Sequence, residues 1–141
     1  MDDNYRNIDQ SLLAAYVRTT YRVDALDLQI RIGLANANLQ QLLTTYGAQT
    51  WAFITAWNPK SVLLSQHENE ARHEMLVKII EKMSYPYFVG HGIGDDENWP
   101  PEQSLLILGI SKQEALALGR QFEQNAIVFG TQNTLPTLVF C

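Results

Sequence analysis

The chain has 141 residues, of which 46% are hydrophobic and 18% charged, and its formal net charge at pH 7 is -5. This length is typical of one domain with a substantial core, and the composition excludes disorder, so we expect a single domain over residues 1–141. The basic residues are scattered and form no stripe of the kind that nucleic-acid-binding proteins show, so we expect no nucleic-acid partner.

Cysteine content and hydropathy bear on the compartment. The single cysteine, Cys141, is the last residue and can form no disulfide within the chain. The acidic start, MDDNYRNIDQ, lacks the basic and apolar segments of a secretory signal, and apolar runs such as SLLILGI are far too short to span a bilayer. We therefore expect a cytoplasmic protein with no membrane partner.

The first three predicted elements are a helix, a strand and a helix. Residues 8–18 place Leu12, Leu13, Tyr16 and Val17 on one helical face. Residues 25–33, ALDLQIRIG, alternate apolar and polar side chains, which predicts a half-buried strand that ends at a glycine. Residues 35–47, ANANLQQLLTTYG, have leucines at helical spacing before Gly47, a residue that commonly stops a helix.

The segment WAFITAW, residues 51–57, predicts a strand that is covered on both sides. Its two faces are both mostly apolar, which is typical of a buried strand. It stops at Asn58-Pro59, and the proline favours an extended backbone at Asn58. We expect Trp57 to be the aromatic side chain nearest to a site at this strand's end.

A helix over residues 66–83 follows, opened by the capping box of Ser65 and Glu68. Its inward stripe comprises Leu76, Ile79, Ile80 and Met83. When this stripe is extended backward, Asn69 and Arg72 occupy positions where core residues are expected. His67 and His73 are expected on the solvated side of the helix.

The second half of the chain continues the alternation of strands and helices. Residues 85–90 predict a strand, residues 104–110 a central strand, and Ser111 and Glu114 a second capping box. The helix that follows should bury Ala115, Leu118 and Phe122, and NAIVFG and TLVFC predict two closing strands. The order predicts an α/β protein in which helices pack on a mixed β-sheet, with a ferredoxin-like core over residues 51–130 as one realisation.

This order places polar residues at the end of strand 51–57 beside the start of helix 66–83. A helix N-terminus offers free amides and a partial positive charge, so it favours anions. We expect Asn58, Lys60, Ser61, Asn69 and Arg72 to converge there on a small anionic ligand. The alternative is structural: Arg72 pairs with an acid and Asn69 hydrogen-bonds the loop.

Two further segments carry candidate residues. Trp99 and Glu102 lie in and after the loop that follows residue 90, and Gln124-Asn125 stand at a predicted helix stop. Glu102 and Glu68 are the general acid–base candidates, although no known catalytic signature is present. The acids at 95–97 and the histidines lack the spacing of metal ligands, so we expect no metal and no cofactor.

Several of these stretches together resemble a bacterial family described as domain of unknown function 3293. The resemblance rests on WAFITAWNP.S, EN..R...L, W.PE.SLLILGIS and F.QNAIVFG, and it extends from about Tyr16 to Val139. It implies a small bacterial protein without an assigned activity. The positions that match its motifs are Asn58, Pro59, Ser61, Asn69, Arg72, Trp99, Glu102, Ser104, Gln124 and Asn125, and Glu123 stands where the motif leads us to expect glycine.

Two hypotheses of function follow from the sequence. In the first, the protein is a binding domain, or an enzyme, for a small anionic ligand. In the second, it is an interaction or regulatory module, such as a homodimer, that pairs through an exposed edge strand like TLVFC. A concave pocket favours the first hypothesis and a broad exposed apolar patch favours the second.

Overall fold

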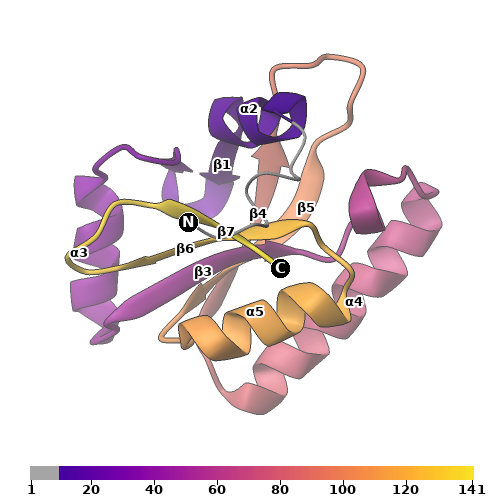
Figure 1. The fold of residues 1–141 in the computed structure, drawn as a ribbon. Helices are drawn as coiled ribbons and strands as arrows, with labels where there is room; N and C mark the ends of the chain where they lie inside the picture. The colour runs from indigo at the N-terminus through magenta and orange to yellow at the C-terminus, as the bar shows by residue number, and fades with distance from the viewer. Residues whose placement is uncertain (1–9) are drawn as a thin grey trace.

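The computed structural model describes residues 10–141, which form one seven-stranded sheet with helices on both of its faces (Figure 1). The predicted helix 8–18 is present over Gln10–Arg18, and its first two residues lie outside the described range. The helices in chain order are α2 (Gln10–Arg18), α3 (Ala37–Tyr46), α4 (Gln66–Met83) and α5 (Lys112–Gln121). The strands are β1 (Thr20–Val23), β2 (Leu28–Ile30), β3 (Thr50–Thr55), β4 (Tyr87–Ile93), β5 (Glu102–Leu108), β6 (Ala126–Thr131) and β7 (Thr137–Phe140).

The strand order confirms the ferredoxin-like core that the sequence suggested. The sheet runs β2-β1-β4-β5-β3-β6-β7, and β3-α4-β4-β5-α5-β6 forms its strand-helix-strand-strand-helix-strand unit. Every neighbouring pair of strands is antiparallel. The sequence prediction of a mixed sheet, with both parallel and antiparallel pairs, was therefore wrong. The reason is that each helical crossover skips one strand position: β5 lies between β3 and β4, which run parallel to each other and are each antiparallel to β5.

Alternation along the strands divides the core into two layers. In β3, Trp51 and Phe53 face one layer, whereas Ala52 and Ile54 face the other, as expected for a strand covered on both sides. Helices α4 and α5 pack together on the second face (Figure 1). Helix α3, with Leu39 and Leu43, and the more exposed α2 cover the first face, which contains the candidate site.

The N-terminal strands differ from the sequence prediction. The predicted strand 25–33 is reduced to Leu28–Ile30 because residues Asp24–Leu26 form a 3-10 turn that ends in a left-handed Asp27. Strand β1 was not predicted, since its four residues, TYRV, are too short to show a period. Both strands nonetheless extend the sheet beyond the ferredoxin-like core, beside β4.

Strand β4 starts two residues later than the predicted strand 85–90 and runs three residues further, through Gly92, which was interpreted as a loop residue. A Cβ atom on Gly90 would lie 2.5 Å from the Arg22 carbonyl oxygen and 3.0 Å from the Phe53 ring, so only glycine fits there. A Cβ atom on Gly92 would have only ordinary contacts at 3.9 Å. Gly92 therefore leaves space above the sheet, and this space belongs to the pocket described below.

Helix α4 begins and ends where the sequence predicted. Ser65 and Glu68 form the expected capping box, and Gly47 ends α3 in the left-handed conformation that favours glycine. His73, however, is buried and not solvated, because the inward stripe at the start of α4 runs through Asn69 and His73. Among the described residues, His73 Nδ1 has no hydrogen-bond partner, and burial lowers the pKa of His73.

Candidate functional site

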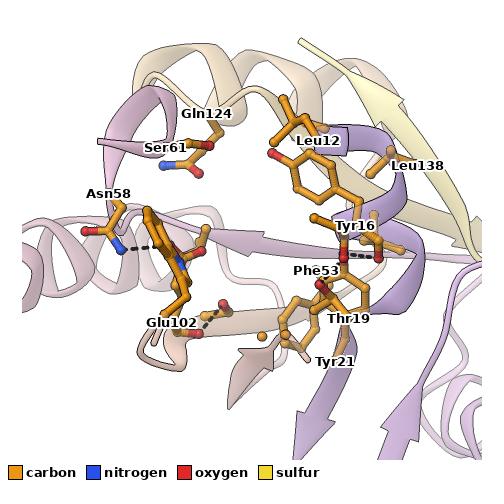
Figure 2. A pocket seen from close by; sticks show the side chains of 18 of the residues that line it. Leu12, Tyr16, Thr19, Tyr21, Phe53, Asn58, Ser61, Glu102, Gln124 and Leu138 are labelled. Carbon is orange, nitrogen blue, oxygen red and sulfur yellow. Dashed lines mark hydrogen bonds between the residues drawn. The ribbon is translucent and has the colours of Figure 1, made fainter. Parts of the chain in front are cut away.

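A pocket of about 310 Å³ lies on the first face of the sheet, between α2 and the C-terminal end of β3. Its floor includes Phe53 and Thr55 of β3, with Ser104 of β5 beside them. Figure 2 shows Leu12 and Tyr16 of α2 on one side of the pocket, and Asn58, Ser61 and Gln124 on the other. Elements from both ends of the chain thus form one concavity.

Asn58 organises the loop after β3. Its backbone adopts the left-handed conformation (φ 48°), which contradicts the extended backbone expected before Pro59. The Asn58 side chain explains this conformation: Oδ1 accepts hydrogen bonds from Asn69 Nδ2 (2.8 Å) and from the amide of Leu64 (3.0 Å). Its Nδ2 donates to Glu102 Oε2 at 2.7 Å (Figure 2). Asparagine tolerates the left-handed region, and these bonds hold it there.

Glu102 is the acidic group of the pocket's inner wall. Its Oε2 accepts hydrogen bonds from Asn58 Nδ2 (2.7 Å) and Trp99 Nε1 (3.2 Å). Burial raises the pKa of Glu102 above its ordinary value, and these two hydrogen bonds oppose that effect. Within residues 10–141, no hydrogen bond is formed to its other oxygen, Oε1, which remains an acceptor at the pocket.

Asn69 and Arg72, the residues chosen by helix phase, lie next to the site but do not line it. Asn69 Oδ1 accepts a hydrogen bond from the Asn58 amide at 2.9 Å, in addition to the bond that its Nδ2 donates. Arg72 donates from Nε to the Ala56 carbonyl (2.7 Å) and from a terminal nitrogen to the Phe122 carbonyl. Its guanidinium also lies 3.7 Å from the Glu123 carboxylate. Both side chains therefore fix the loops that form the pocket wall.

The turn between α5 and β6 supplies the rest of that wall. Gln124 is buried, and its Nε2 donates to the carbonyls of Trp57 (3.0 Å) and Phe122 (3.2 Å). Asn125 Nδ2 donates to Ser61 Oγ at 3.0 Å, and the Lys60 amide donates to the Glu123 carbonyl at 2.8 Å. The Lys60 side chain is exposed, and neither Lys60 nor Asn125 lines the pocket.

Of the nine candidate residues from the sequence, five line the pocket: Asn58, Ser61, Trp99, Glu102 and Gln124. The other four, Lys60, Asn69, Arg72 and Asn125, surround it and hold its loops.

Sequence reasoning missed the aromatic part of the lining, which consists of Tyr16, Tyr21 and Phe53 in addition to Trp99. Tyr16 had been assigned to an apolar helix face and Phe53 to a buried strand, and both positions also fit an ordinary core. The pKa of Tyr16 is raised to about 12, mainly by burial and to a lesser extent by the nearby Glu102 carboxylate. Its hydroxyl is therefore neutral at physiological pH.

Trp57 does not occupy the position expected for it. Strand β3 ends at Thr55, whose Oγ1 accepts a hydrogen bond from the Trp57 amide at 3.0 Å and turns the chain. Trp57 lines a second, more open hollow with Asp24, His91 and Gln103. The tryptophan of the main pocket is Trp99.

The charge of the pocket is one-sided. Its lining includes three carboxylates, those of Asp95, Asp96 and Glu102, and no Lys, Arg or His among the described residues. Asp95 pairs with Arg18 at 3.0 Å, a contact that links the end of α2 to the loop after β4. Asp96 accepts a hydrogen bond from the Asn98 amide. The lining is therefore acidic and rich in acceptors.

Residues 10–141 show neither a metal site nor a membrane-spanning helix. No group of three or more His, Cys, Asp or Glu side chains within residues 10–141 is arranged to hold a metal ion. None of the helices in the same range is long and apolar enough to cross a membrane.

Comparison with known proteins places the chain in a family. Residues 54–127, just over half of the chain, match the family described as protein of unknown function (DUF3293), and the chain belongs to this family. The match contains every motif position from Asn58 to Asn125 and the part of the ferredoxin-like core from the end of β3 to the start of β6. No curated protein and no solved structure matches the chain significantly.

Proposed function

We propose that the protein binds a small organic molecule in the pocket beside Glu102, with the ligand's polar end donating a hydrogen bond to Glu102 Oε1. The observation that carries this proposal is an acceptor without a partner among the described residues, at the wall of a concavity of about 310 Å³. Pockets that bind small molecules have this character: mostly apolar walls with a few polar groups that fix orientation.

Backbone strain near Glu102 supports the proposal. Asn58, Lys60 and Ser61 all have positive φ angles, 48°, 53° and 60°. Non-glycine residues in this region cost of the order of 1–3 kcal/mol each and cluster at binding and active sites. The network of Asn69 and Asn125 maintains this conformation and directs Asn58 toward Glu102.

The nature of the lining favours a donor over the anion that the sequence suggested. The start of α4 is already capped by Ser65 and Glu68, so its free amides are partly satisfied and its charge is partly neutralised. The pocket itself presents carboxylates and no basic side chain among its described residues. An anionic group would be repelled by this lining, whereas a donor would be attracted.

The test is a screen of a small-fragment library by protein NMR, read at the Trp99 indole N–H. This group donates to Glu102 Oε2, so a ligand at Glu102 should shift its resonance. Trp99→Phe assigns the signal among the three indoles. Gly92→Leu should fill the pocket and abolish the shifts, because a Cβ atom there has room to be accommodated.

Lys78→Leu is the matched control and should retain the shifts. Lys78 lies on the exposed side of α4, a helix that packs on the face of the sheet opposite the pocket. The proposal fails if no fragment moves the Trp99 signal, or if Gly92→Leu binds the same fragments as the unaltered protein.

A second candidate function, pairing with a partner through an edge strand, has one observation in its favour. Strand β7 lies at the end of the sheet with β6 as its only neighbouring strand among the described residues. Edge strands offer unpaired backbone groups to other chains. Light scattering over a wide concentration range tests self-pairing, and a monomer throughout would count against a homodimer.

A further inference from the structure

The hydrogen bonds within the pocket wall use up most of its donors. Gln124 Nε2 is engaged with two carbonyls, and the hydroxyls of Thr55, Ser104 and Thr19 donate to the carbonyls of Gln103, Glu102 and Ala15. The Trp99 indole donates to Glu102. Apart from the hydroxyls of Tyr16 and Ser61, the polar groups that remain available to a ligand in the pocket are acceptors.

Two of these acceptors stand out. Glu102 Oε1 accepts no hydrogen bond within residues 10–141, and neither does the Gln124 side-chain oxygen, Oε1, whose position is fixed by the two bonds of its amide nitrogen. One of these acceptors belongs to a carboxyl group, which carries negative charge when it is ionised. A complementary group would carry several N–H donors, no acceptor and a positive charge, and an ammonium group has these properties.

We propose that the pocket takes a protonated primary or secondary amine with an apolar body, so that the ammonium group binds Glu102 Oε1; this rests on the proposed small-molecule binding. The aromatic walls support the assignment. Trp99, whose indole nitrogen lies 3.2 Å from Glu102 Oε2, brings its ring next to the carboxylate, and Tyr16, Tyr21 and Phe53 also line the pocket. Aromatic faces attract cations and also pack against an apolar body.

The size of the pocket limits the body of the ligand. A volume of about 310 Å³ is at the lower end for small-molecule sites, so one ring with a short chain is an appropriate probe. Four probes share the same phenylethyl body and differ only in their head: phenethylamine, 2-phenylethanol, trimethyl(phenethyl)ammonium and 3-phenylpropanoate. These heads are a donor-rich cation, a neutral donor, a cation without donors and an anion.

The expected order of affinity, measured by NMR titration of the Trp99 indole, begins with phenethylamine. The alcohol should bind about tenfold more weakly or worse, because a hydrogen bond to a charged acceptor is much stronger when the donor is also charged. The quaternary ammonium should be weaker than the amine because it offers no N–H group. The propanoate should produce no shift, because the lining repels it.

Glu102→Gln provides the decisive variant. The amide oxygen of glutamine can accept both bonds now made to Glu102 Oε2, so the wall is retained while the free acceptor becomes a donor. Phenethylamine affinity should fall about tenfold or more, and binding of the alcohol should change little. A thermal melt verifies that the variant is folded, and Lys78→Leu should bind phenethylamine like the unaltered protein.

The outcomes separate this inference from the proposed function. If the alcohol binds as tightly as the amine in a manner blocked by Gly92→Leu, the pocket binds small molecules but the amine assignment is wrong. The assignment is also overturned if the propanoate binds best, if Glu102→Gln leaves phenethylamine affinity unchanged, or if phenethylamine fails while other fragments bind. If neither the four probes nor the fragment library shifts the Trp99 signal, both proposals fail.

Discussion

Arg72 joins three segments of the chain that are far apart in sequence. Its guanidinium donates to the carbonyls of Ala56 and Phe122 and lies 5.8 Å from the centre of the Phe122 ring. Its side chain is only 25% exposed. The ends of β3 and α5 are thus held together by a residue of α4, and the pocket wall depends on that junction.

Replacing Arg72 should therefore lower stability. In Arg72→Ala the Phe122 carbonyl keeps its bond from Gln124, but the Ala56 carbonyl loses the Arg72 donor, which costs about 1–3 kcal/mol. Arg72→Lys should lose less, since lysine retains a donor but lacks the planar fork. Urea denaturation measures both variants, with the exposed Arg31→Ala as the control. A loss below about 0.5 kcal/mol would mean that Arg72 is dispensable for the fold.

The helix phase identified Asn69 and Arg72 as polar residues facing inward, but it did not reveal their partners. Those partners are an amide in the strand-end loop for Asn69 and carbonyls of Ala56 and Phe122 for Arg72. Backbone groups carry no sequence signal, so a pattern cannot distinguish a residue that holds a loop from one that contacts a ligand. Glu102, Trp99 and Asn58 were identifiable because polar or aromatic residues interrupt strand and loop patterns there.

The elements themselves were more predictable than their contacts. Capping residues and periodicity located α3, α4 and α5 because these signals are local. Strand β1 and the extension of β4 were missed because their pairing is long-range: Arg22 pairs with His91, and Tyr21 pairs with Gly92. The pocket depends on these missed parts, since Tyr21 and Gly92 come from them.

The turn from α5 to β6 contains a non-glycine residue in the left-handed conformation. Glu123 has φ 58°, in the region that favours glycine, at the position where the family's motif led us to expect glycine. Glu123→Gly should leave the unfolding free energy unchanged or raise it by up to about 1 kcal/mol, because relief of the left-handed strain offsets the greater freedom of the unfolded chain. The exposed contact to Arg72 at 3.7 Å contributes little.

Glu123→Val is the matched variant for the same turn, and it should lower the unfolding free energy, since a β-branched residue is strongly disfavoured at positive φ. Chemical denaturation of both variants provides the comparison. If Glu123→Gly is destabilised by more than about 1 kcal/mol, the carboxylate makes a larger contribution than its exposure suggests.

The pocket arises where two parts of the fold meet. The ferredoxin-like core presents an apolar face with Phe53, Leu106 and Val128 opposite α4 and α5. Helices α2 and α3 cover this face, and the space left between α2 and the sheet is the pocket. The matched family range supplies Asn58, Trp99, Glu102 and Gln124, whereas the α2 wall lies outside it.

A buried carboxylate at this junction links stability to pH. Burial raises the pKa of Glu102 above 4.5, and the hydrogen bonds from Asn58 and Trp99 only oppose this effect. A group whose pKa is higher in the folded than in the unfolded protein binds its proton preferentially in the folded state. Its contribution to the unfolding free energy is therefore largest below pH 4.5 and is lost as the pH rises through the folded pKa.

Comparison with Glu102→Gln isolates this contribution, because glutamine does not titrate. As the pH is lowered from about 7 to 4.5, the unfolding free energy of the unaltered protein should rise relative to that of the variant. Burial lowers the pKa of His73, the charge of His91 acts in the same direction, and Glu74 opposes them, so His73 destabilises the fold on acidification. Both proteins contain His73, so this effect cancels in the difference between their unfolding free energies. Urea unfolding at several pH values measures the gap. The prediction is contradicted if this difference in unfolding free energy stays constant, or if the variant gains stability relative to the unaltered protein at low pH. Either result would show that the Glu102 carboxyl is as well solvated in the folded protein as in the unfolded chain.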